Sequence, residues 1–138
     1  MNNYHGYVAS RPFGGMVIPV PAQNSCIREY ILKKGGRYIL PPLESYYPGC
    51  YHQLFGLLNT IPKNSIIIMY SLSMLPLDNI IKINSIKNIS IQKKIRYAFV
   101  LENFECTLNE GRFQDEANSY SLAKFQAKTI NIEKYFYD

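Results

Sequence analysis

Apolar and polar positions along the chain follow two alternating spacings, one typical of strands and the other of helices. Residues 65–72, SIIIMYSL, are almost continuously apolar and rich in β-branched side chains, as in a parallel strand covered on both faces. Shorter apolar runs predict further strands at residues 4–10, 37–43 and 96–102. The two prolines of the run at 37–43 place that strand near a sheet edge or end it early.

Helical spacing occurs between these strands. Prolines after the first strand predict a long loop up to about Ala22, where Asn24 or Ser25 can cap a first helix that ends at a pair of glycines. Apolar residues between 51 and 58 predict a second helix. A third helix opens at residues 76–78, although its length stays open.

The order of these elements predicts the fold class. Alternating strands and helices favour right-handed crossovers and a three-layer α/β fold, with a mostly parallel sheet of four to five strands flanked by helices. We expect one domain over residues 1–138, in which residues 109–138 add a C-terminal helix near 115–127 and a tail. Residues 130–138 suit a strand, a short helix or a packing arm.

Composition agrees with a folded chain. The 138 residues are 47% hydrophobic and 18% charged, which is ordinary for a globular domain. No apolar run reaches the ~20 residues of a membrane-spanning helix, and the N-terminus lacks the layout of a signal peptide. We therefore expect a cytoplasmic protein without a membrane span. Its three widely spaced cysteines predict neither a disulfide framework nor a metal site.

Polar residues follow every predicted strand. Carboxyl ends of parallel strands meet at one edge of a sheet, where ligands bind. Arg11 offers a planar fork of donors for a phosphate or carboxylate, and Glu44 or Glu102 can act as acid or base. Alternatively, Arg11 forms a local ion pair with one of these glutamates. The residues expected at this edge are Ser10 and Arg11, Glu44 and Tyr46, Tyr70 and Ser71, and Glu102.

The start of the first helix is a second candidate site. Gln23, Asn24 and Arg28 lie where free backbone N–H groups favour an anion. Alternatively, Asn24 only caps the helix and Arg28 is solvated. Neither His5 nor His52 has a partner at metal-ligand spacing, and no glycine-rich phosphate motif is present, so we expect no metal and no cofactor.

Four segments resemble a known family. They are GYVASRPF at 6–13, QNSCIREY at 23–30, LESYYPGCY at 43–51 and IIMYSLSMLP at 67–76. Together they resemble the sporadic carbohydrate-cluster protein family, small bacterial proteins encoded among surface-polysaccharide genes. The resemblance covers residues 4–102 and implies a role in glycan or nucleotide-sugar metabolism.

The same layout more distantly resembles the catalytic domain of serine recombinases. Ser10 falls at the position of the nucleophile of that family. Residues 70–76, however, stand where recombinases carry Asp-Arg and a further arginine, and no helix-turn-helix tail follows. The resemblance therefore implies a resolvase-like or flavodoxin-like fold with other chemistry and no DNA partner.

These observations lead to two hypotheses. In the first, the protein is an enzyme of capsule or lipopolysaccharide biosynthesis that acts on a sugar phosphate or nucleotide-sugar as an isomerase, epimerase or lyase. Ser10, Glu44 and Tyr70 would be catalytic. In the second, it is a non-catalytic sugar-binding or partner-binding accessory protein. We also expect a homodimer, because the chain carries many tyrosines and isoleucines. The residues expected to bind substrate are Arg11, Gln23, Asn24, Arg28, Tyr46, Ser71 and Glu102.

Overall fold

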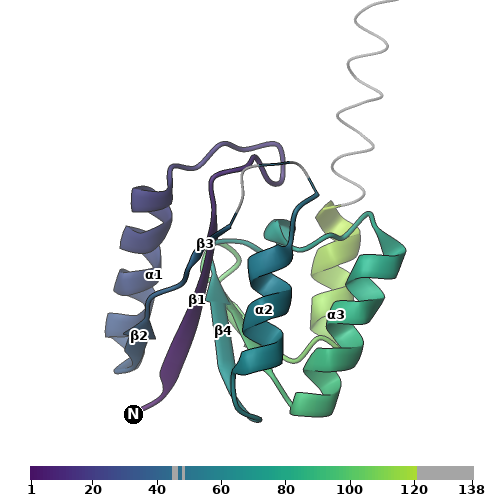
Figure 1. Cartoon of the computed structure of the whole chain (residues 1–138). Coiled ribbons are helices and arrows are strands. Elements are labelled where there is room, and N and C mark those ends of the chain that lie inside the picture. The colour runs from purple at the N-terminus through teal and green to yellow at the C-terminus, as the bar shows by residue number, and fades with distance from the viewer. Residues whose placement is uncertain (45–46, 48, 121–138) are drawn as a thin grey trace, which may run out of the picture.

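The computed structural model of the chain describes residues 1–44, 47 and 49–120. Within these residues, six strands form one sheet (Figure 1). The strand order is β2-β1-β4-β5-β6, and β3 also pairs with β1. All neighbouring strands are parallel except β6, which runs antiparallel to β5. The predicted α/β class with a mostly parallel sheet is confirmed, with six strands in place of four to five. The strands are β1 (Asn3–Ala9), β2 (Arg37–Ile39), β3 (Leu43–Glu44), β4 (Ile66–Met69), β5 (Arg96–Phe99) and β6 (Phe104–Cys106).

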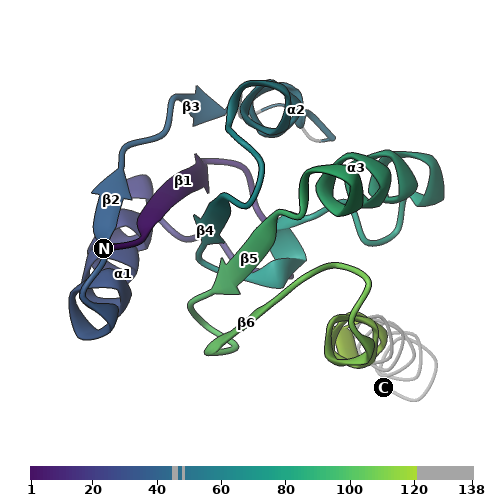
Figure 2. The same cartoon turned by 90° about the horizontal axis from the view of Figure 1, so that it is seen from below.

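Helices cover both faces of the sheet. α1 (Val20–Lys34) lies alone on one face, whereas α2 (His52–Thr60) and α3 (Ile80–Lys93) lie on the other (Figures 1 and 2). Residues 111–120 form a further helix on the side of α3. None of the helices in the described part of the chain is long and apolar enough to cross a membrane.

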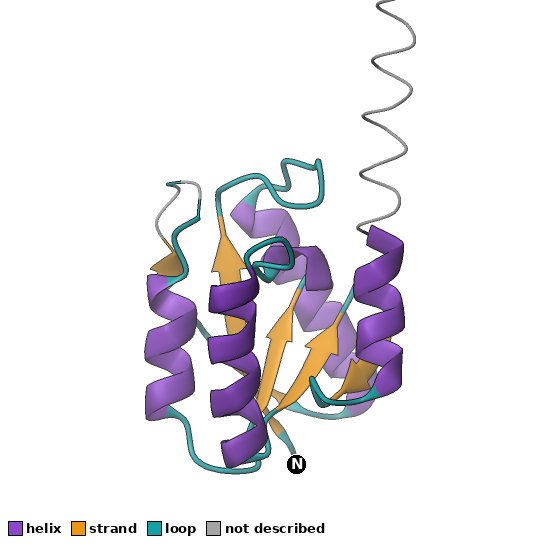
Figure 3. Ribbon diagram, turned by 90° about the vertical axis from the view of Figure 1, so that its right-hand side faces the viewer, coloured by secondary structure: helices purple, strands orange, loops and turns teal. Residues whose placement is uncertain are grey.

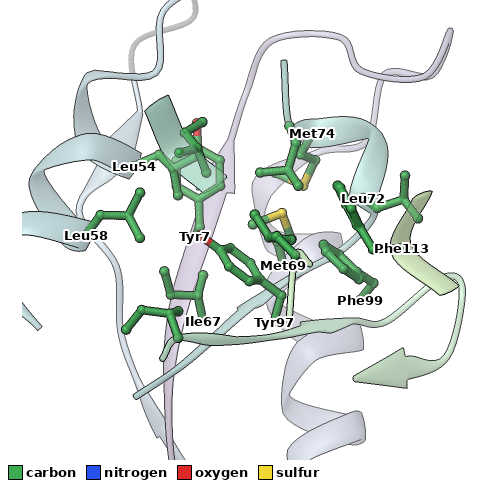
Figure 4. Packing of buried hydrophobic residues seen from close by; sticks show 14 of the residues in the cluster. Tyr7, Leu54, Leu58, Ile67, Met69, Leu72, Met74, Tyr97, Phe99 and Phe113 are labelled. Atoms are coloured by element: carbon green, nitrogen blue, oxygen red, sulfur yellow. The ribbon is translucent and has the colours of Figure 1, made fainter. Parts of the chain in front are cut away.

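Side chains of β4 show why the central strand is apolar throughout. Ile66 and Ile68 pack with residues of α1 in one core cluster, whereas Ile67 and Met69 belong to the larger cluster on the opposite face. All four are at most 8% exposed, as expected for a strand covered on both faces. Figure 4 shows the larger cluster, in which side chains from three parallel strands meet those of α2.

The first helix begins earlier than predicted. α1 starts at Val20 and includes Pro21, because proline is tolerated in the first turn of a helix, where its missing N–H needs no partner. Asn24 therefore lies inside α1 and does not cap it. At the other end Gly35 adopts φ 71°, as predicted for a glycine that ends a helix.

The predicted strand at 37–43 is two strands. β2 pairs with the start of β1, and β3 pairs with its end. Pro41 and Pro42 lie between them and lack the N–H groups that a continuous ladder requires. Glu44 consequently lies within β3 and not after it.

The C-terminal region contains a strand that the sequence pattern did not reveal. The predicted strand at 96–102 ends at Phe99, and the chain then turns through Asn103, at φ 57°, into the three-residue β6. A strand this short shows no alternation that can be recognised in a sequence. The predicted helix near 115–127 is described only to residue 120, where the helix at 111–120 confirms its first part.

Candidate functional site

A pocket of about 650 Å³ lies at the carboxyl edge of the parallel strands. This edge, towards which the arrows of β1, β4 and β5 point in Figure 3, is where α/β sheets bind ligands. The pocket is lined by residues 11–15 after β1, Gly49 and Tyr51 before α2, Ser73 and residues 75–79 after β4, Lys82 of α3, and Tyr120.

Arg11 is the buried cation of this pocket. Its side chain lines the pocket although the residue is only 4% exposed. Nη2 donates to the Tyr7 hydroxyl at 2.9 Å and to the Met74 carbonyl at 3.2 Å, and the guanidinium carbon lies 4.3 Å from the ring centroid of Tyr51. Nη1 is buried and has no hydrogen-bond partner among the described residues. Both hydrogen bonds of the guanidinium therefore come from Nη2.

Glu44 is linked to Arg11 through Tyr7. The Tyr7 hydroxyl donates to Glu44 Oε2 at 3.0 Å, and the same oxygen accepts from the backbone N–H groups of Gln53 at 2.9 Å and Leu54 at 3.3 Å. A carboxylate is favoured at this position because the N-terminus of α2 carries partial positive charge. Burial raises the pKa of Tyr7 well above its ordinary value, so its proton is retained. Glu44, 1% exposed, thus holds the start of α2 against the sheet.

Ser71 and Glu102 meet in a second polar cluster. Glu102 Oε2 accepts from the Ser71 hydroxyl at 2.8 Å and from the Tyr120 hydroxyl at 2.5 Å, and Oε1 accepts from the Leu72 N–H at 2.8 Å. Burial and the bond to Glu102 raise the pKa of Tyr120 to about 12. These bonds connect the turns after β4 and β5 with the helix at 111–120. Only Tyr120 and the neighbouring Ser73 face the pocket.

Ser10 and Tyr70 lie beside the pocket without lining it. Ser10 is exposed at the bend after β1, directly before Arg11. Tyr70 follows β4 and places its ring 6.1 Å from that of Phe13, a residue of the pocket wall. Together with Glu44, these predicted catalytic residues lie at the predicted edge of the sheet but do not meet at one point.

The residues predicted at the start of α1 contact other parts of the fold. Gln23 is fully buried, and its Nε2 donates to the carbonyls of Ala9 at 2.7 Å and Ile18 at 2.9 Å. Asn24 accepts from the Tyr38 hydroxyl at 2.8 Å, and the guanidinium of Arg28 lies 5.5 Å from the Tyr38 ring. Tyr46 lies outside the described residues.

Sequence reasoning missed Lys82. Its Nζ donates to the Gly49 carbonyl at 2.6 Å and lies 5.5 Å from the ring centroid of Tyr51. Lys82 lies in the first turn of α3, where its N–H donates to the capping side chain of Asn79 at 3.1 Å. A capping asparagine directly before an apolar run was the signal that could have placed this turn, and with it Lys82, at the carboxyl edge.

Comparisons with known proteins identify similar folds only. No family model matches the sequence, and no curated protein matches it. Solved structures with a similar fold include the following two. A resolvase family site-specific recombinase from Streptococcus pneumoniae gives a TM-score of 0.58 at 10% identity, covering 98% of this chain and 94% of the other. The N-terminal catalytic domain of TP901-1 integrase gives 0.55 at 11% identity, covering 94% and 98%.

These comparisons correct the functional predictions. The resemblance to the carbohydrate-cluster family finds no support in them. The predicted sugar phosphate or nucleotide-sugar chemistry, whether isomerase, epimerase or lyase, is wrong, because both similar structures are recombinase or integrase domains. The exclusion of a DNA partner is wrong for the same reason. In fold, this chain is similar to the catalytic domains of resolvase-type site-specific recombinases.

Proposed function

We propose that this chain is a recombinase-like domain that binds a DNA phosphate at the carboxyl edge of its sheet, with Arg11 as the cation that receives it. One observation carries the proposal: Arg11 lines a pocket at this edge and has a buried, unpartnered Nη1. The similarity in fold to DNA recombinases makes DNA the phosphate-bearing partner to test first.

The energetics favour an anion at this position. A buried donor without a partner costs roughly 1–3 kcal/mol, so a phosphate oxygen that accepts from Nη1 removes a penalty already present in the free protein. Because Nη2 already donates to Tyr7 and Met74, the contact with a phosphate falls to the two N–H donors of Nη1. A net charge of +5 also attracts a polyanion.

Strand cleavage is a second candidate function, favoured by the exposed hydroxyl of Ser10 directly before Arg11. In such a step Ser10 Oγ forms a bond to phosphorus while the bond between phosphorus and one sugar oxygen breaks. The serine proton leaves to solvent or a base, and the departing sugar oxygen takes up a proton. Arg11 would stabilise the negative charge that develops on the phosphoryl oxygens.

Fluorescence anisotropy with a labelled DNA duplex tests the binding proposal. We expect binding that weakens steeply between about 50 mM and about 200 mM salt, and a loss of at least about tenfold in affinity for Arg11→Met. The matched control is Arg37→Met, which removes the same charge from an exposed residue at the start of β2. Equal losses for both variants, or no DNA binding by the natural chain, would contradict the proposal.

Cleavage is tested separately with a nicked DNA substrate that traps covalent intermediates. A protein–DNA adduct that disappears in Ser10→Ala supports strand cleavage, whereas binding without an adduct restricts the function to binding.

Because the proposed ligand is DNA, we also propose a cytoplasmic location.

A further inference from the structure

We infer that the pocket holds one nucleotide unit with a terminal phosphate, at a DNA end or overhang, and does not hold the backbone of a continuous duplex. The inference rests on the proposed function and specifies which part of DNA this site binds. It is based on the charges, the walls and the rigidity of the pocket.

Two cations approach the pocket from different elements. Arg11, after β1, and Lys82, on α3, lie 4.3 Å and 5.5 Å from the centroid of the same ring, that of Tyr51. The Lys82 ammonium has three donors, and the Gly49 carbonyl accepts from one of them. A terminal phosphate carries about −1.5 to −2 charge, more than the single charge of an internal phosphodiester. The carboxylate of Asp78 also lines the pocket, so the two cations leave the wall with an excess of positive charge that suits a terminal phosphate.

The remaining wall is largely apolar. Phe13, Leu75 and Leu77 line the pocket together with Pro12 and Pro76. A protein contacts the backbone of a duplex through exposed positive charges, and these contacts do not require an apolar cavity. Bases, in contrast, stack on aromatic and apolar side chains wherever they are unpaired. A volume of about 650 Å³ lies in the range of sites that enclose a small molecule.

The loop that carries Arg11 is fixed against the opposite wall. Gly14 has φ 56°, and a Cβ placed there would lie 2.6 Å from Ser73 Oγ, so only glycine permits this approach. Ser73 in turn belongs to the hydrogen-bonded cluster of Ser71 and Glu102. The pocket is therefore formed before a ligand binds, which lowers the entropy cost of binding.

The experiment compares three small probes by isothermal titration calorimetry: deoxyadenosine monophosphate, deoxyadenosine and inorganic phosphate. We expect the monophosphate to bind at least about tenfold more tightly than either of its parts, because it alone contacts both the cations and the apolar wall. Lys82→Met should weaken monophosphate binding by about tenfold, and the matched control Lys87→Met, on α3 but not in this pocket, should not. Leu77→Ala should weaken the monophosphate and leave inorganic phosphate unchanged.

Equal affinities for phosphate and monophosphate would overturn the inference. So would equal binding of a blunt duplex without terminal phosphates and a 5′-phosphorylated duplex with an overhang. If DNA binds in an Arg11-dependent way and the monophosphate does not compete with it, the inference fails and the proposed function stands. If no DNA of any form binds, the proposed function itself fails.

Discussion

Tyr7 connects the two buried charged groups of the site. Its hydroxyl accepts from Arg11 and donates to Glu44, so both charges depend on a single oxygen for part of their hydrogen bonding. Tyr7→Phe removes this oxygen and nothing else. We expect a loss of about 1–3 kcal/mol in the free energy of unfolding, because two buried groups each lose one partner.

Urea unfolding measures this loss, with Tyr70→Phe as the control. The Tyr70 ring is also partly buried, but its hydroxyl bonds to no described residue. A Tyr7→Phe variant as stable as Tyr70→Phe would show that the hydroxyl of Tyr7 does not join the two charges.

The partly buried position of His5 makes the free energy of unfolding depend on pH. It lies in β1 between neighbouring strands, and burial lowers its pKa below the ordinary value of 6.5. The unfolded chain therefore binds a proton at this position before the folded chain does. The free energy of unfolding should fall as pH drops below about 6.5, and this part of the loss should be complete once pH is below the folded pKa.

The measurement is the change in unfolding free energy between about pH 7 and about pH 5, made on His5→Gln and His52→Gln. His52 is the exposed histidine at the start of α2. We expect a shallower pH dependence for His5→Gln than for His52→Gln. The same slope in all three proteins would rule out His5 as a source of the pH dependence.

Individual residues of the site could be predicted only in part. Arg11 was recognisable, because a cation directly after a buried strand must lie near the carboxyl edge. Its burial and its unpartnered Nη1 depend on Tyr51 and Met74, residues distant in sequence that the fold brings to it. The contacts of Glu44 with the start of α2 likewise depend on how the chain returns to the sheet.

At the scale of elements, the loop from 11 to 15 decides the shape of the pocket. Gly14 and Gly15 both have positive φ, but only Gly14 lies close to another side chain, that of Ser73. Gly15→Ala should cost about 1–2 kcal/mol through backbone strain alone. Gly14→Ala should cost more, because the added Cβ also displaces Ser73, and it should weaken phosphate binding.

Thermal unfolding of both variants, together with phosphate titration, checks this prediction. Two variants with equal losses of stability and unchanged phosphate affinity would show that the contact between Gly14 and Ser73 does not shape the pocket.

Helices and strands could be predicted well where their pattern was long. β4 and α2 followed from apolar spacing, since burial imposes that spacing directly. Errors occurred at prolines and at short strands. Pro21 is compatible with the first turn of α1, and the pair at 41 and 42 divides one predicted strand into two. Neither outcome is decided by local sequence alone.

At the scale of the whole molecule, the layers were predictable and the chemistry was not. Alternating strands and helices with apolar central runs lead to a parallel sheet covered on both faces, whatever the function. The same fold supports many activities, which is why a resemblance in a few segments led to the wrong ligand class. The predicted homodimer stays a prediction. Ile80 and Ile81 of α3, which are 73% and 77% exposed, are side chains that such an interface would cover.

NMR of the arginine side chains shows whether Arg11 receives a phosphate of DNA. In protein labelled with ¹⁵N in its five arginines, Arg11→Lys identifies the Arg11 guanidinium resonances. On titration with a 5′-phosphorylated oligonucleotide, these resonances should shift in a saturable way, whereas those of Arg37 should not move. Saturable binding of the oligonucleotide with the Arg11 resonances unchanged would show that Arg11 does not receive the phosphate.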